Sequence, residues 1–96
     1  MADFLFLMHG DGAPIDDAAW GPYFASIRAA GAFDGGSAIG AGECVRKSGP
    51  VPPIAAQLTG YIRVSANDLV TARRWLAGNP VYEAGGTIEI RELPRG

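Results

Sequence analysis

The longest unbroken apolar run in this chain comes near its start, from Phe4 to Met8. A run of five residues is typical of a strand covered on both faces, although periodicity alone does not exclude a buried helix segment. Strand side chains alternate between the two faces of a sheet. One face would then carry Phe4, Phe6 and Met8, and the other Leu5, Leu7 and His9. The pattern predicts a central strand that needs cover on each side.

A helix is predicted next, over residues 16–31. Asp16-Asp17 suits its first turn, where free backbone N–H groups and the helix dipole favour carboxylates. Gly31 suits the position just after its end. One apolar stripe is spaced as in a helix and consists of Trp20, Phe24 and Ile27. Because Pro22 cannot donate a backbone hydrogen bond, either a short turn precedes a helix that begins near Pro22, or one helix kinks there. The first alternative is slightly favoured.

Glycines and prolines make the middle of the chain harder to interpret. Residues 33–39 and 42–47 are strand-like but are interrupted by glycines, which indicates two short strands or one bulged strand. Residues 48–53 contain three prolines, so they predict a loop. Residues 57–65 alternate cleanly and predict a strand with Leu58 and its alternate neighbours on one face.

A second helix is predicted over residues 66–77. Ser65-Ala66-Asn67-Asp68 resembles a capping box with Asp in place of Glu, and Leu69, Ala72, Arg73 and Leu76 would line one face. Gly78-Asn79-Pro80 would stop this helix. After a connection over residues 82–86, a last strand is expected over residues 87–93.

The alternation of elements predicts an α+β fold. The order strand, helix, one or two strands, strand, helix, strand is the ferredoxin-like βαββαβ pattern, an antiparallel sheet with helices 16–31 and 66–77 on one face. Residues 1–96 would form a single domain. The second face of the central strand would stay open in a monomer, so we expect a homodimer that packs two sheets face to face.

Composition narrows the classes of partner. The chain has 96 residues, of which 48% are hydrophobic and 19% charged, and its net charge is −2. Scattered basic residues and a negative net charge argue against nucleic acid or an anionic membrane as partner. Cys44 is the only cysteine, and no apolar run approaches the roughly 20 residues of a membrane span. A cytoplasmic protein is expected.

Several short segments resemble the YCII-related family, and within it the DGPF-type branch. They cover nearly the whole chain and comprise Met8-His9-Gly10-Asp11, residues 27–31, Ser48-Gly49-Pro50, residues 57–61, Trp75-Leu76-Ala77, and residues 79–86 leading into the last strand. The resemblance implies a ferredoxin-like protomer that assembles into a dimeric α+β barrel.

Two features depart from that family. The Asp-Gly-Pro-Phe segment that names the branch is replaced by Ser48-Gly49-Pro50-Val51. In the YCII branch a histidine and an aspartate form a proposed acid–base pair, and here Trp20 and Asn79 occupy the matching positions. Neither side chain can shuttle a proton near neutral pH. The family's pair of catalytic residues is therefore not carried over to this chain.

His9 is the only histidine and stands at the end of the central strand, where pockets of α/β proteins often open. It could act as a general base with Asp11 as its orienting carboxylate. The alternative is a histidine at a strand end that is satisfied by the backbone or by water, and a single histidine without a demonstrated partner favours this alternative. No metal site and no cofactor are expected.

A ligand pocket would be lined by aromatic side chains with polar tips and by a polar side chain that can hydrogen-bond to the ligand. The candidates are Trp20, Tyr23, Tyr61, Asn79 and Tyr82. Such side chains also fill cores and dimer interfaces. Two hypotheses follow. We favour a non-catalytic dimer that binds a small molecule or a partner protein, and the alternative is a small isomerase or lyase that uses His9 with Asp11.

Overall fold

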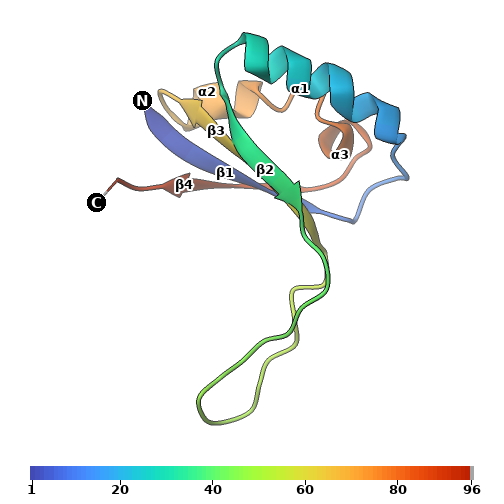
Figure 1. Ribbon diagram of the computed structural model, residues 1–96, viewed down its shortest axis with the longest axis vertical. Helices are drawn as coiled ribbons and strands as arrows, with labels where there is room; N and C mark the ends of the chain where they lie inside the picture. The colour runs from blue at the N-terminus through green and yellow to red at the C-terminus, as the bar shows by residue number, and fades with distance from the viewer. Residues whose placement is uncertain (96) are drawn as a thin grey trace.

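The computed structural model describes residues 1–95, and the described residues form an α+β structure with a four-stranded antiparallel sheet (Figure 1). In chain order the elements are β1 (Ala2–His9), the 3-10 turn η1 (Asp17–Ala19), α1 (Trp20–Ala29), β2 (Phe33–Ala38), β3 (Leu58–Ala66), α2 (Leu69–Arg74), α3 (Pro80–Glu83) and β4 (Ile88–Leu93). The fold class predicted from the alternation of elements is confirmed at this level.

The strand order in the sheet is β2-β3-β1-β4. Strand β1 pairs antiparallel with β3 on one side and with β4 on the other, so that Phe6 lies opposite both Ile62 and Ile90. The prediction that the first strand is central is therefore confirmed.

The face of the sheet that carries Phe4, Phe6 and Met8 is turned toward the helices, which lie on one side of the sheet (Figure 1). Phe6 is 0% exposed and has Ile62 beside it on β3 and Ile27 of α1 in the same core. The strand alternation thus divides β1 into a fully buried set and a second set on the opposite face.

The opposite face of the sheet has no helix over it in residues 1–95. Leu5 and Leu7 are half-buried there, and their cross-strand partners are Arg63 and Tyr61 of β3. On the β4 side the partners of Leu5 and Leu7 are Arg91 and Glu89. This open face is less apolar than the pattern of β1 alone suggests, because its flanking strands contribute charged side chains.

Pro22 falls in the first turn of α1 and does not kink the helix. Asp16 caps the preceding 3-10 turn, with its Oδ1 accepting the backbone N–H of Ala18 at 3.0 Å. Helix α1 then begins at Trp20, two residues before the proline, where a missing N–H has no helical partner to lose. Gly31 has φ +70° and ends the helix as expected.

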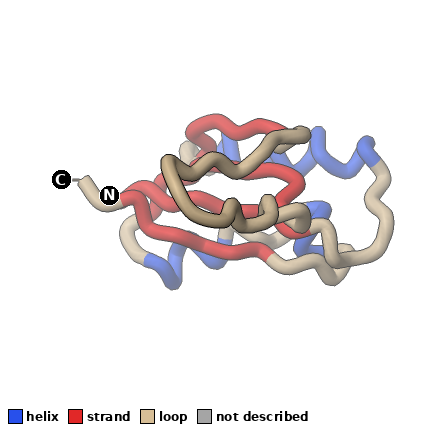
Figure 2. Tube along the Cα trace, turned by 90° about the horizontal axis from the view of Figure 1, so that it is seen from below, coloured by secondary structure: helices blue, strands red, loops and turns tan. Residues whose placement is uncertain are grey.

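The prediction of a strand at 42–47 is wrong, because residues 39–57 form one long loop between β2 and β3. Gly40 and Gly42 weaken the outgoing branch, and the returning branch contains three prolines that cannot donate ladder hydrogen bonds. The predicted loop at 48–53 is confirmed. Figure 1 shows the segment projecting from the body of the molecule, and Figure 2 shows it doubled back on itself in front of the strands.

The second helical region differs from its prediction in both register and length. The cap of α2 is Asp68, whose Oδ1 accepts the N–H of Thr71 at 2.8 Å, and Ser65 lies within β3. Leu69 is 50% exposed, so it does not belong to the buried face on which we placed it. Beyond α2, the unpredicted helix α3 begins directly after Asn79. No helix within residues 1–95 is long and apolar enough to cross a membrane.

Candidate functional site

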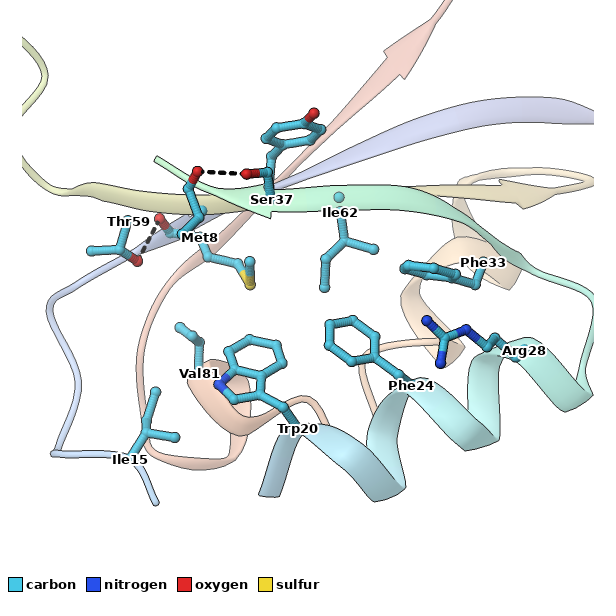
Figure 3. Close-up of a pocket in the computed structure, with 14 residues that line it drawn as sticks. Met8, Ile15, Trp20, Phe24, Arg28, Phe33, Ser37, Thr59, Ile62 and Val81 are labelled. Carbon is cyan, nitrogen blue, oxygen red and sulfur yellow. Dashed lines mark hydrogen bonds between the residues drawn. The ribbon is translucent and has the colours of Figure 1, made fainter. Parts of the chain in front are cut away.

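A cleft of about 550 Å³ lies between α1 and the edge of the sheet formed by β2 and β3 (Figure 3). Its floor contains Met8 and Ile62 from the sheet, and its opposite wall contains Trp20 and Phe24 from α1. Phe33, Val81 and Ile15 close its sides. The cleft is therefore apolar and aromatic in most of its lining.

The cleft exists because small residues occupy helix-facing positions where β2 pairs with β3. Gly36 of β2 lies opposite Ile62, and Ala38 lies opposite Gly60 of β3. A Cβ atom on Gly60 would come within 2.9 Å of the Met8 Cε. Since these positions present no large side chain, Met8 packs directly over Gly60, and the space beside it stays open beneath α1.

Aromatic rings from two elements meet at the wall of the cleft. The rings of Trp20 and Phe24 are stacked with centroids 5.5 Å apart, and Phe24 packs at 5.3 Å against Phe33 at the start of β2. Trp20 and Phe24 are one helical turn apart, so both rings face the sheet. A flat apolar molecule in the cleft would contact this wall.

Arg28 is the charged side chain in the lining of the cleft. Its Cζ atom lies 4.9 Å from the ring centroid of Phe33 and 5.7 Å from that of Phe24. These distances correspond to cation–π contacts. A positive charge is thus held at one end of an aromatic cleft, as Figure 3 shows.

A second cavity of about 380 Å³ adjoins the cleft at the end of β1 and shares Ile15, Thr59 and Val81 with it. Its lining includes His9 and the loop that follows. That loop is packed tightly, because a Cβ on Gly12 would come within 2.5 Å of the Gly86 nitrogen. The sequence predicted a pocket at the end of the first strand. The two cavities meet at that position.

His9 and Asp11 have different partners in the structure. The Nε2 atom of His9 lies 3.4 Å from Glu89 Oε1, a contact too poorly aligned to count as a hydrogen bond. Asp11 accepts the hydroxyl of Thr87 at 2.7 Å and its backbone N–H at 2.8 Å. These two hydrogen bonds hold the pKa of Asp11 below its ordinary value. The carboxylate beside His9 is that of Glu89, which the spacing of His9 and Asp11 along the chain does not indicate.

Tyr23 and Asn79 lie in the core and do not line the cleft. The Tyr23 hydroxyl donates to the carbonyl of Trp75 at 2.8 Å, and burial raises the pKa of this hydroxyl. Asn79 is 0% exposed, and its Oδ1 accepts the N–H of Tyr82 at 3.1 Å to cap α3. Both polar groups are engaged in holding the backbone.

Tyr61 and Tyr82 also lie apart from the ligand position expected for them. Tyr61 contributes to the lining, but strand alternation places its side chain on the open face, opposite Leu7. Tyr82 is 48% exposed and lines a shallow depression beside α2. Of the five pocket candidates, only Trp20 directs its side chain into the cleft.

Phe24, Arg28 and Phe33 line the cleft and were missed as site residues. Trp20, Phe24 and Arg28 follow one another at intervals of four, which places them on one helix face, and this spacing was the available signal. Gly36 and Gly60 leave space beneath α1 only because of the register between β2 and β3, and the sequence does not show that register. Within residues 1–95, no group of three His, Cys, Asp or Glu side chains could hold a metal ion.

Comparison with models of protein families gave no match, and a search among curated proteins likewise found no significant similarity.

Proposed function

We propose that this chain is a small-molecule-binding module, a divergent YCII-related protein of the DGPF type with a ferredoxin-like protomer. The observation that carries the proposal is the aromatic cleft between α1 and the sheet. A concave apolar site of several hundred Å³ with few polar groups is the usual form of a small-molecule site. Trp20 at the family's histidine position supports binding without acid–base chemistry, because an indole cannot shuttle a proton.

Blocking the cleft tests this proposal. Ala38 is exposed and lines the cleft, so Ala38→Leu would fill the space without disturbing the core. A neutral naphthalene carboxamide should shift the indole N–H signal of Trp20 in a proton–nitrogen NMR spectrum, with saturation at millimolar concentration. Ala38→Leu should abolish the shift. Ala29→Leu, at an exposed site of α1 outside the lining, is the matched control. A signal that Ala38→Leu leaves unchanged would contradict the proposal.

The same proposal includes a homodimer, formed as a dimeric α+β barrel through the open face of the sheet. Leu5 and Leu7 are the apolar centre of that face, and Tyr61 lies beside Leu7. The surrounding charges are partly paired on the same chain. Arg63 contacts Asp3 and Asp34, each at 3.1 Å. An apolar centre with a polar rim is the usual anatomy of a protein interface.

Sedimentation velocity tests the dimer. The wild-type chain should sediment as a dimer at micromolar concentration, and Leu7→Asp should sediment as a folded monomer, because a charge would then be buried at the centre of the contact. Leu69→Asp, on an exposed apolar residue of α2, is the control and should stay dimeric. A wild-type monomer would remove the dimer from the proposal and leave the cleft untouched.

A second candidate function is an isomerase or lyase in which His9 moves a proton. The contact of His9 with Glu89, beside the second cavity, is the observation that favours it. NMR titration of the imidazole would decide. A midpoint displaced from that of free histidine, and moved by Glu89→Gln or Asp11→Asn, would favour chemistry. A midpoint near 6.5 that neither variant changes would count against it.

A further inference from the structure

The guanidinium of Arg28 carries a positive charge at the rim of the cleft, and no carboxylate of residues 1–95 forms an ion pair with it. The arginines that form ion pairs there are Arg63, Arg91 and Arg95. The nearest acidic residue along the chain, Asp34, pairs with Arg63 instead. An exposed arginine without a partner is common, but this one lines an aromatic cavity.

The two rings under Arg28 orient its guanidinium. Because Phe24 and Phe33 both contact the group, fewer side-chain rotamers are open to it than to a free surface arginine. None of the Arg28 N–H donors makes a hydrogen bond within residues 1–95, so they are available to a ligand. A carboxylate could accept two of these donors at once, which is the strongest arrangement for this pair.

The remaining lining offers little to a polar ligand. The Thr59 hydroxyl already donates to the carbonyl of Met8 at 3.4 Å, and the Ser37 hydroxyl donates to the carbonyl of Ala38 at 2.8 Å. Met8, Ile62 and Val81 present only apolar atoms. A ligand that matches the cleft therefore has an apolar body and one anionic end.

We propose that the cleft binds aromatic carboxylates, with the ring against Trp20 and Phe24 and the carboxylate on Arg28. This inference rests on the proposed binding function and adds the chemical class of its ligand. It follows because Arg28, which forms no ion pair within residues 1–95, lies at the end of a wall that is otherwise apolar and aromatic. An aromatic carboxylate should bind more tightly than the corresponding amide, because the two share the ring and differ in charge.

Two matched probes test the charge. Naphthalene carboxylate and naphthalene carboxamide have the same ring and nearly the same shape, and only the first is anionic at neutral pH. The wild-type chain should bind the carboxylate roughly fivefold to tenfold more tightly, the ratio expected from one charge-assisted pair at a partly exposed site. Arg28→Gln should bring the ratio of the two affinities close to one. Arg73→Gln, on α2, should retain the preference for the carboxylate.

The indole N–H signals of the two tryptophans provide the readout and an internal control. Trp20 lines the cleft and should respond, whereas Trp75 lies at the end of α2 and should not. Equal affinity for the two probes, or a preference that persists in Arg28→Gln, would overturn the inference and leave cleft binding intact. Failure of both probes to shift the Trp20 signal would overturn the proposed function and the inference together.

Discussion

Replacing Asn79 with alanine removes a helix cap and a buried polar contact at once. Asn79 is fully buried, its Oδ1 caps α3 through the N–H of Tyr82, and its Nδ2 lies 3.8 Å from the Met8 sulfur. Asp68 makes the equivalent cap on α2 at an exposed position. The pair therefore compares a cap in the core with a cap in water.

The expected losses follow from these surroundings. Removing an exposed cap lowers the free energy of unfolding by about 1 kcal/mol, so Asp68→Ala should lose that much. Asn79→Ala loses its cap at a part-buried N–H, that of Tyr82, and also leaves a void in the core, which adds about 1–3 kcal/mol. The total for Asn79→Ala is about 2–4 kcal/mol. In a chain of this size that corresponds to a fall in melting temperature of roughly 10–30 °C, against roughly 4–8 °C for Asp68→Ala.

Urea and thermal denaturation followed by circular dichroism would measure both losses. The protein concentration must be the same throughout, because any dimer makes the apparent stability depend on it. Equal m-values for the two variants would show that the losses reflect the folded state. If Asn79→Ala loses no more than Asp68→Ala, then the burial of Asn79 adds nothing and the reasoning is refuted.

Three further predictions concern other parts of the fold. Phe6→Asp should yield no folded protein, because the side chain is 0% exposed among core residues, and a cooperative unfolding transition in this variant would show that Phe6 is misplaced. Gly31→Ala should lower the free energy of unfolding by about 1 kcal/mol, because the φ of Gly31 is +70°. Gly21 lies inside α1, so Gly21→Ala should raise the free energy of unfolding by up to about 1 kcal/mol. A urea titration would measure both changes. The folded-state pKa of Asp11 lies below its ordinary value of 3.8, so the stabilising effect of Asp11 is complete above pH 3.8 and is lost as the pH falls through the folded-state pKa. The urea midpoint should therefore depend less on acid pH in Asp11→Asn than in the wild-type chain. An unchanged dependence would argue against the Thr87 contact.

Local chemistry along the chain was sufficient for much of the fold. The apolar run of β1 identified a central strand, and alternation alone divided its residues between the two faces. Gly31 ended the first helix because few other residues adopt a positive φ without strain. The prolines at 50, 52 and 53 excluded a sheet there, since proline cannot donate to a ladder. Each of these conclusions depends on a residue and its immediate neighbours.

Competition between nearby residues was harder to resolve. Ser65 and Asp68 can both cap a helix, and the sheet decided between them, because β3 extends to Ala66 and carries Ser65 with it. The segment at 42–47 has strand-like residues, but a strand needs a partner, and the facing branch supplies none. Asn79 was expected as a stop signal or a ligand handle, whereas packing buried it as the cap of α3.

What the sequence determined by itself was therefore the order of β1, α1, β2, β3, α2 and β4 and the face of β1 that each of its side chains occupies. These follow from apolar runs and from periods of two or about four residues. The tertiary structure alone decided the cleft. Its floor required strand register to place Gly36 opposite Ile62 and Ala38 opposite Gly60. Its charged end required Arg28 to meet Phe33 across a turn. Space between elements is a property of distant residues that meet, so no single stretch of the chain records it.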